Sequence, residues 1–296
     1  MTQPPAHIAL IGFGEAGQAF ARGWRREAPG LEIRAFDIKT DGPDAAGKRA
    51  DYAGAQITGC DGPEGLAGHP LVSLVTADQA GAAARAQAAH ITPGTLYLDG
   101  NSCAPETKRA ASEVIEAAGG RYVDMAIMAP VHPRLHRVPV LLAGPHAEDA
   151  RAFCQSLGMS PGVAGDEVGQ ACAVKMLRSV MVKGIEALCL ESLLAAQKAG
   201  VADQVIASLD ASHPGWDWAA KAAYNFERMT THGTRRAAEM REVATTVGAL
   251  GLDNGMSRAT AAWAETVGQL GQLSTDEDFC ARADALLAAL EERKIQ

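Results

Sequence analysis

A glycine-rich segment near the N-terminus constrains the fold of this chain more than any other feature of its sequence. It follows the short apolar run His7–Ile11 and opens a stretch with helical spacing, Glu15–Glu27. In a strand–turn–helix unit, the first glycine of a G-x-G-x-x-G motif makes a tight turn, the second admits a pyrophosphate and the third lets helix and strand pack closely. The segment has this pattern in full and is predicted to bind a dinucleotide: Gly12, Phe13, Gly14, Glu15, Ala16 and Gly17.

An acidic side chain lies where such a motif requires one. Asp37 ends the second apolar strand, Leu31–Phe36, twenty residues after Gly17. A carboxylate at this place accepts hydrogen bonds from the adenosine ribose and repels the 2′-phosphate of NADP. We therefore expect NAD as the cofactor, with NADP as the alternative because Lys39 could attract that phosphate. Thr76, which follows a later strand, is an additional expected cofactor contact.

Apolar strands alternate with helix-length stretches through the first half of the chain. Further strands are expected at Leu71–Val75, Thr95–Leu98, Tyr122–Asp124 and Val138–Leu142, and helices at Gln79–Ala89, Pro105–Ala118 and Ala147–Leu157. Strands separated by helices form βαβ units and a parallel sheet. We therefore predict an α/β fold with a Rossmann-type, doubly wound parallel sheet in residues 1–164.

The second half of the chain is predicted to be all-helical. Val168–Ala199 is a proline-free helical stretch more than twice the average helix length. Further helices are expected at Ala202–Leu209, Trp216–Arg228, Thr234–Leu250, Met256–Leu270 and Asp276–Arg293. We predict an all-α domain over residues 165–296 for substrate binding and dimerisation. Its apolar helix surface exceeds what one small core needs, so we expect a homodimer.

Composition and charge limit the classes of partner. Hydrophobic residues make up 47% of the chain, and the formal net charge is −8. This balance favours a packed globular protein and argues against nucleic acid or an anionic membrane as partner. No apolar run is long enough to span a membrane, and residues 1–7 do not resemble a signal peptide.

The cysteines and histidines indicate a compartment and exclude a metal site. Six cysteines without a C-x-x-C pair are typical of reduced thiols, so we expect a cytoplasmic protein. His132 and His136 are separated by a proline and lack a nearby carboxylate, so no metal is expected.

Four further segments point to a known family. They are Asp99–Pro105, Val123–Pro130, Gly169–Ser179 and His232–Met240. Together with the glycine motif they resemble the β-hydroxyacid dehydrogenase superfamily, which includes 3-hydroxyisobutyrate and 6-phosphogluconate dehydrogenases. The resemblance covers nearly the whole chain. It is closest to a phosphogluconate dehydrogenase-like branch with a helical C-terminal domain of its own.

The resemblance implies where the reaction takes place. It puts Asn101 and Ser102 near the nicotinamide and the substrate, and it makes Lys175 the essential lysine of the catalytic helix. Where the common family has Ser-Gly-Gly in its substrate loop, this chain has Met128, Ala129 and Pro130. The family's asparagine four residues after the lysine is Ser179 here. A simple 3-hydroxy acid substrate therefore does not follow from the resemblance.

Lys175 has the chemistry that the reaction needs. Carbonyl reduction requires a hydride on carbon and a proton on oxygen, and a lysine can supply or accept that proton. The residues that flank Lys175 are apolar, which argues against a lysine on a solvated helix surface. Ser179, one turn further, could hydrogen-bond the same oxygen. Lys183, two turns further, is expected to be a secondary substrate contact or an ion-pair partner of Glu186.

Basic residues after the altered loop could bind an anionic substrate group. These are His132, Arg134, His136 and Arg137, and a solvated basic loop is the alternative interpretation. The sequence thus predicts an NAD(P)-dependent dehydrogenase or reductase acting on a small hydroxy acid or a related alcohol or carbonyl. Two other functions stay open: an imine reductase, which Lys175 disfavours, and a non-catalytic NAD-binding protein, which Lys175 and Asn101 disfavour.

Overall fold

The computed structural model describes residues 5–271, 273–274 and 278–295. Contacts divide the chain into two compact units, Met1–Met176 and Leu177–Gln296. The long helix α6 (Gln170–Lys198) contributes to both, because Ala171 near its start packs against the sheet of the first unit. The division by contacts therefore lies inside a helix, whereas the boundary suggested by the sequence, after residue 164, lies before it.

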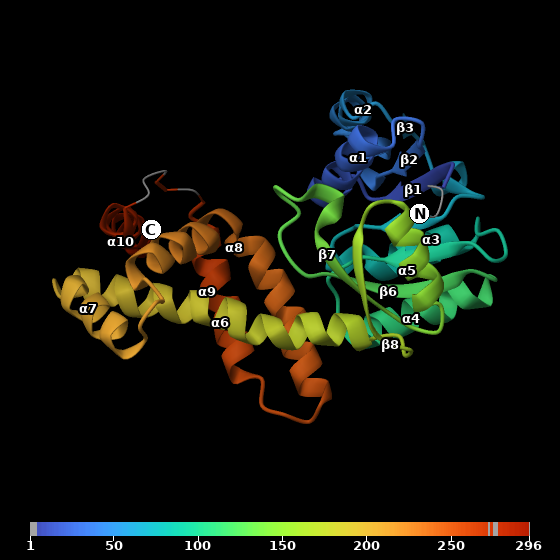
Figure 1. The fold of residues 1–296 in the computed structure, drawn as a ribbon. Coiled ribbons are helices and arrows are strands. Elements are labelled where there is room, and N and C mark those ends of the chain that lie inside the picture. Colours follow the sequence, from blue (N-terminus) through green and yellow to red (C-terminus); the bar gives the residue numbers. More distant parts are fainter. Residues whose placement is uncertain (1–4, 272, 275–277, 296) are drawn as a thin grey trace. The chain divides into compact units, whose positions relative to one another are not determined.

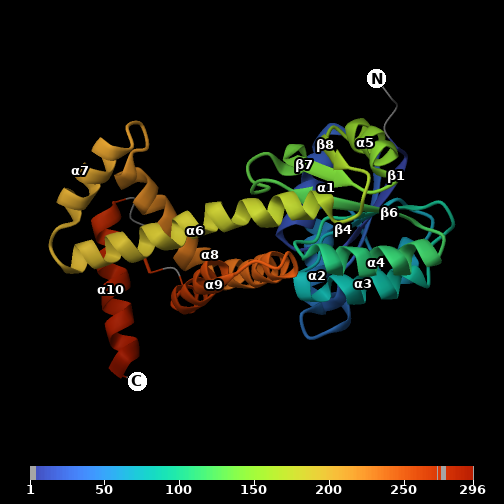
Figure 2. The ribbon, with the colours of Figure 1, turned by 90° about the horizontal axis from the view of Figure 1, so that it is seen from below.

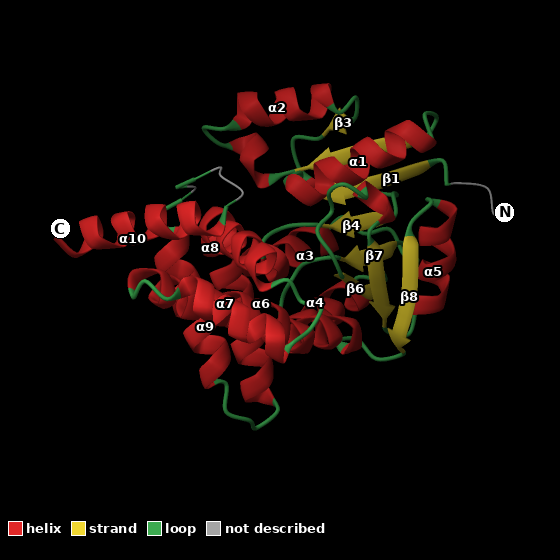
Figure 3. Cartoon of the chain, turned by 60° about the vertical axis from the view of Figure 1, so that its left-hand side comes forward, coloured by secondary structure: helices red, strands yellow, loops and turns green. Residues whose placement is uncertain are grey.

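Unit 1 is built on one eight-stranded sheet (Figures 1 and 3). In spatial order the strands are β3 (Thr58–Gly59), β2 (Glu32–Phe36), β1 (His7–Ile11), β4 (Leu71–Ser73), β5 (Leu96–Asp99), β6 (Arg121–Ile127), β7 (Pro139–Ala143) and β8 (Ser160–Gly165). Every neighbouring pair is parallel except β6 and β7. The order reverses between β1 and β4, which makes the sheet doubly wound and confirms the predicted fold class.

Helices cover both faces of this sheet, and Figure 2 shows them as separate layers. Helices α1 (Glu15–Glu27) and α5 (Ala147–Ser156) share one core with the strands, in which Phe20 and Trp24 are buried. Helices α3 (Ala80–Ala88) and α4 (Pro105–Ala117) pack on the opposite core, which contains Tyr97, Tyr122 and Ile115. Helix α2 (Ala45–Gly54) follows β2. Short 3-10 turns occupy Ile38–Asp41, Pro63–Leu66, Ala77–Gln79 and Leu135–Arg137.

Unit 2 contains the rest of α6 with α7 (Ala202–Ser212), α8 (Trp218–Ala249), α9 (Gly255–Gly268) and α10 (Phe279–Ile295), and no strand occurs among its described residues. Its core joins α6 to α8 and α10 through Leu190, Phe226 and Leu286. Gly233 of α8 lies so close to α9 that a Cβ there would be 2.5 Å from the carbonyl oxygen of Ala264. The absence of a side chain is therefore what allows these two helices to approach.

Three features differ from the sequence-based expectation. The two predicted helices Trp216–Arg228 and Thr234–Leu250 form the single helix α8, because Gly233 serves a helix contact instead of a break. The sheet is not wholly parallel, since β7 returns antiparallel to β6. Elements β3, α2 and β8 were not expected, and β8 contains a proline and two glycines. Asp276, the predicted start of the last helix, lies outside the described residues.

Candidate active site at the sheet edge

The glycine loop between β1 and α1 forms an open cradle. Gly12 has φ +86°, and a Cβ there would be 2.7 Å from the carbonyl oxygen of Leu74. A Cβ on Gly17 would be equally close to the carbonyl oxygen of Gly12, whereas one on Gly14 would meet nothing within 4 Å. Packing thus requires the first and third glycines, and the second leaves free space beside the start of α1. That arrangement suits a pyrophosphate group.

Asp37 ties this loop to the end of β2. Its Oδ2 accepts a hydrogen bond from the Phe13 N–H at 2.7 Å, and its Oδ1 accepts one from the Lys39 N–H at 3.0 Å. Its side chain stays partly exposed, and the Lys39 ammonium lies in solvent, 3.9 Å from Asp44. Lys48 of α2 donates to the Phe13 carbonyl at 2.8 Å. That buried lysine could not be predicted from the sequence, because α2 itself was not expected.

Asn101 joins the loops that follow β4 and β5. Its Oδ1 accepts from the Val75 N–H at 2.7 Å, and its Nδ2 donates to Ser73 Oγ at 3.0 Å. Thr76 is exposed directly beside this junction. The hydroxyl of Ser102 is enclosed and makes no hydrogen bond within the described part of the chain. A buried hydroxyl of this kind calls for a partner, which a bound ligand can provide.

The predicted substrate loop follows β6. Met128 and Ala129 are partly buried, and Pro130, His132 and Arg134 are exposed. The Met128 N–H donates to the Pro139 carbonyl at 2.9 Å, which fixes the start of the loop on β7.

The other two basic residues of this segment face α1. His136 Nε2 lies 3.2 Å and Arg137 Nε 2.8 Å from the carboxylate of Glu27. Burial lowers the pKa of His136 although Glu27 opposes the shift. His136 and Arg137 therefore hold the loop against α1, which is a different role from binding an anionic substrate.

These loops share one edge of the sheet. The glycine loop, Asp37, Thr76, Asn101 and Met128 each follow the carboxyl end of a strand in the parallel run from β2 to β6. The edge includes the switch point between β1 and β4, where ligands bind in open α/β sheets. Within unit 1 the structure therefore brings the predicted cofactor residues together.

The start of α6 is anchored on the same sheet. Asp124 Oδ2, on β6, accepts hydrogen bonds from the N–H groups of Gly169 at 3.1 Å and Cys172 at 3.0 Å. A carboxylate at this place caps free N–H groups and complements the positive end of the helix. Lys175 lies one turn further along and is partly exposed.

Two buried ion pairs connect α6 and α8 inside unit 2. Lys183 lies 2.6 Å from Glu239, and Arg236 binds Glu186. The expected pairing of Lys183 with Glu186 is wrong, because α8 supplies a separate partner for each charge. Burial lowers the pKa of Lys183 and raises the pKa of Glu186, and the opposite charges only partly offset these shifts. Ser179, on the same face of α6, is also buried.

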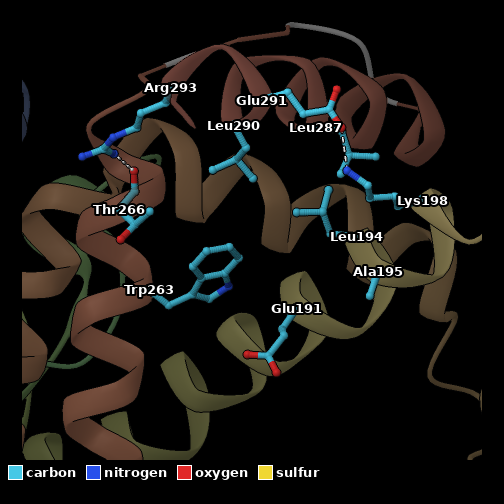
Figure 4. Close-up of a pocket in the computed structure, with 10 residues that line it drawn as sticks. All are labelled: Glu191, Leu194, Ala195, Lys198, Trp263, Thr266, Leu287, Leu290, Glu291 and Arg293. Carbon is cyan, nitrogen blue, oxygen red and sulfur yellow. Dashed lines mark hydrogen bonds and ion pairs between the residues drawn. The ribbon is translucent and has the colours of Figure 1, made fainter. Parts of the chain in front are cut away.

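A cavity in unit 2 contains none of the predicted site residues. It measures about 580 Å³ and lies between α6, α9 and α10, where Trp263, Leu194 and Leu290 form apolar walls (Figure 4). The ion pair Lys198–Glu291 lies at its rim. The described residues hold no group of three or more His, Cys, Asp or Glu side chains able to bind a metal ion. None of their helices is long and apolar enough to cross a membrane.

The fold and the sheet edge define a Rossmann-type protein with a helical second part, and comparisons with known proteins place it further. A model described as a domain of unknown function, DUF1932, matches residues 196–267. A conserved hypothetical protein from Sinorhizobium meliloti 1021 is 35% identical, with 96% of each chain covered and a TM-score of 0.76. The chain belongs to the β-hydroxyacid dehydrogenase superfamily, in the phosphogluconate dehydrogenase-like and 3-hydroxyisobutyrate dehydrogenase-like branch with this C-terminal domain.

Two further solved structures share the fold, and one further protein matches part of the sequence. A conserved protein of unknown function, described as structurally similar to 3-hydroxyacid dehydrogenases, is 29% identical over 89% of this chain and 97% of its own, with a TM-score of 0.70. The 3-hydroxyisobutyrate dehydrogenase of Mycobacterium tuberculosis, solved with L-serine, is 17% identical over 95% and 99%, with a TM-score of 0.73. An uncharacterized 28.5 kDa protein of Methanothermus fervidus is 29% identical over 115 residues, or 39% of this chain and 43% of that protein.

Proposed function

We propose that this protein is an NAD(P)-dependent oxidoreductase that transfers a hydride between the nicotinamide and a small hydroxy acid or a related alcohol or carbonyl compound. The observation that carries the proposal is the open cradle at Gly14, bordered by Asp37 and by the start of α1. Support comes from the family, whose members named above include a dehydrogenase acting on a 3-hydroxy acid.

The cofactor would be held by the residues that follow the parallel strands. The loop of residues 12–17 would receive the pyrophosphate, and Asp37 and Lys39 would face the adenosine ribose. Thr76 and Asn101 would contact the nicotinamide end. We favour NAD because the carboxylate of Asp37 is anchored by two N–H groups and cannot turn away from a 2′-phosphate.

Lys175 carries the acid–base part of the reaction. The bound nicotinamide supplies the hydride acceptor or donor. Lys175 takes the proton of the substrate hydroxyl during oxidation and returns it during reduction. Ser179, one turn along the same helix face, would donate a hydrogen bond to that oxygen.

The remaining site residues would contact other parts of the substrate. Ser102 would satisfy its hydroxyl on the substrate. Met128, Ala129 and Pro130 would line the substrate with apolar groups. The exposed His132 and Arg134 would bind an anionic group of the substrate. Lys183 would be a secondary substrate contact, held in place by its ion pair with Glu239.

Hydride transfer and the Lys175→Met variant test this proposal. Wild-type protein should bind NAD(H) in calorimetry and should reduce NAD with at least one compound of a panel of hydroxy acids, polyols and amino alcohols. Lys175→Met should retain cofactor binding and lose turnover by roughly 10² to 10⁴, the usual contribution of a positioned acid–base group.

A matched control distinguishes the loss of proton transfer by Lys175 from the mere loss of one positive charge. Lys221→Met removes a partly exposed lysine of α8, whose ammonium lies 4.9 Å from the ring centre of Trp216, and it should leave turnover unchanged. Near-normal turnover in Lys175→Met would refute the acid–base role. Transfer to imines alone would favour the imine reductase, and cofactor binding without any transfer would favour a non-catalytic protein.

We further propose a homodimer formed mainly by residues after 165. Apolar side chains lie exposed on unit 2, among them Leu188, Leu252 and Met256, and the groove at Trp263 is apolar as well. Light scattering should give twice the mass of the chain, and a monomer at micromolar concentration would contradict the proposal.

All six cysteines are free thiols, which supports a reducing compartment such as the cytoplasm.

A further inference from the structure

A fully buried charge cluster lies beneath the sheet edge and joins Asp124, which caps α6, to two residues that the proposed function does not use. Asp99 of β5 and Asp124 of β6 are register partners on neighbouring parallel strands, and neither side chain is exposed. Lys108 of α4 is also fully buried, and its ammonium lies 2.9 Å from Asp99 Oδ1 and 3.5 Å from Asp124 Oδ1. One ammonium thus joins two carboxylates that would otherwise repel each other across the sheet.

Each carboxylate holds a different part of the candidate site. Asp99 Oδ1 accepts from the Asn101 N–H at 2.9 Å, and its Oδ2 accepts from the Tyr122 hydroxyl at 2.7 Å. Asp124 uses its Oδ2 to cap the start of α6, the helix of Lys175. Its Oδ1 has no hydrogen bond in the described chain, so the Lys108 ammonium is the charge that holds that oxygen.

We propose that Lys108 is a positioning residue that holds the start of α6 against the loop of Asn101. It acts by cancelling the repulsion between Asp99 and Asp124, so that the helix cap and the loop keep one relative position. This inference rests on the proposed function, because it assigns Lys175 to α6 and the nicotinamide to Asn101. Burial alone would lower the pKa of Lys108, but the two carboxylates outweigh burial and raise it, so the ammonium stays charged.

The first test uses hydrogen exchange on the protein without added cofactor. Lys108→Met leaves two unpaired carboxylates side by side, so amides 169–176 should exchange about tenfold faster. Ile115→Val is the matched control, because Ile115 is a fully buried, apolar residue of the same helix α4. Its substitution should leave those amides unchanged. Equal exchange in the two variants would overturn the proposal.

A double variant tests directly whether Lys108 acts by cancelling the repulsion between Asp99 and Asp124. In Asp124→Asn the amide oxygen can still cap α6, while the repulsion with Asp99 is gone. Adding Lys108→Met to this background should therefore change exchange at 169–176 by less than about threefold, against tenfold in the wild-type background. The same effect in both backgrounds would show that Lys108 acts only by filling space. If Lys108→Met does not fold, the double variant should, and failure of both would also overturn the proposal.

Kinetics separates this inference from the proposed function. Lys108→Met should lower kcat by roughly ten- to a hundredfold through misplacement of α6, while the Kd for NAD(H) and the KM change by less than about threefold. Unchanged kcat in a folded Lys108→Met variant would contradict the positioning role of Lys108 and leave the dehydrogenase proposal intact. If the wild type neither binds NAD(H) nor transfers a hydride, the proposed function fails, and the exchange experiments still decide the role of Lys108.

Discussion

Both units contain buried ion pairs, but the buried carboxylates of unit 1 are also held by backbone N–H groups. In unit 1 the buried or half-buried carboxylates Asp37, Asp99 and Asp124 each accept at least one hydrogen bond from a backbone N–H. In unit 2 the buried charges of α6, Lys183 and Glu186, contact charged side chains of α8. A backbone N–H group has no side-chain rotamers and cannot rotate away, whereas two side chains on helices can move together.

This difference indicates separate roles for the two sets of charges. Side chains fixed by backbone groups keep one geometry, as a binding or catalytic site requires. Ion pairs between helices set the register of those helices, and apolar residues of similar volume can often replace such pairs without loss of stability. Substitutions of the backbone-anchored carboxylates in unit 1 should therefore change binding and turnover first, and substitutions of the ion-paired charges between α6 and α8 should change folding first.

The largest expected effect would be on the stability of unit 2. Arg236→Met leaves the buried Glu186 carboxylate without its partner, which should lower the free energy of unfolding by about 3–5 kcal/mol in urea titrations. The pair of changes Arg236→Met and Glu186→Leu should recover most of that loss. Arg241→Met is the control, because its pair with Glu265 is more than half exposed on the arginine side and should contribute far less to stability. Equal losses of unfolding free energy in Arg236→Met and Arg241→Met would contradict the prediction that the buried pair matters more than the exposed one.

The second effect would be on cofactor choice in unit 1. Asp37→Asn keeps an acceptor for the Phe13 N–H and removes the negative charge. Wild-type protein should bind NAD(H) more tightly than NADP(H), and the variant should narrow that gap by about tenfold, as expected for one charged hydrogen bond. Calorimetry with both cofactors measures the gap. A wild type that binds NADP(H) tenfold more tightly than NAD(H) would contradict the predicted cofactor preference and would point to Lys39 or Arg34 as ligands of the 2′-phosphate.

The same contrast explains how much could be predicted from the sequence. The strand–glycine–helix unit at the N-terminus is local, and Glu15–Glu27 is helical with the predicted ends. The carboxyl ends of parallel strands meet at one edge, so the strand order places Asp37 and Asn101 on the same edge of the sheet. Residues such as Lys108 could not be found in this way. A lysine on a helix is usually solvated, and its burial depends on two aspartates from other strands.

Long-range partners explain the other differences as well. Glu186 was the nearest acidic residue in sequence to Lys183, yet Glu239 of α8 is its partner. The strand β8 consists of Ser-Pro-Gly-Val-Ala-Gly, a sequence with little strand preference, and it forms through pairing with β7. In both cases tertiary contacts decide what local preference leaves open.

A smaller effect is expected at Ser179. Its substitution by alanine removes one neutral hydrogen bond and leaves proton transfer by Lys175 intact, so turnover should fall only several-fold, in line with about 1 kcal/mol. Steady-state kinetics would measure this, with Ser208→Ala on the exposed side of α7 as the control. A loss as large as that of Lys175→Met would mean that Ser179 itself takes part in proton transfer.

The smallest effect concerns pH and the loop held by His136. Burial keeps the folded-state pKa of His136 below its ordinary value of 6.5. As the pH falls below 6.5, the unfolded chain binds a proton that the folded chain does not, so this histidine should lower stability until the pH reaches its folded pKa. The pKa of Glu27 is also lowered, because the salt bridges to Arg137 and His136 outweigh the opposing effect of burial, so its contribution is lost only below its ordinary value of 4.5. Urea unfolding of wild type and His136→Gln should therefore diverge between pH 6.5 and 5, with the wild type losing more stability, by less than about 1.4 kcal/mol per pH unit. Gly23 of α1 lies directly against the His136 ring, where a Cβ would collide with that ring. A difference in stability that is constant with pH would show that His136 only fills space there.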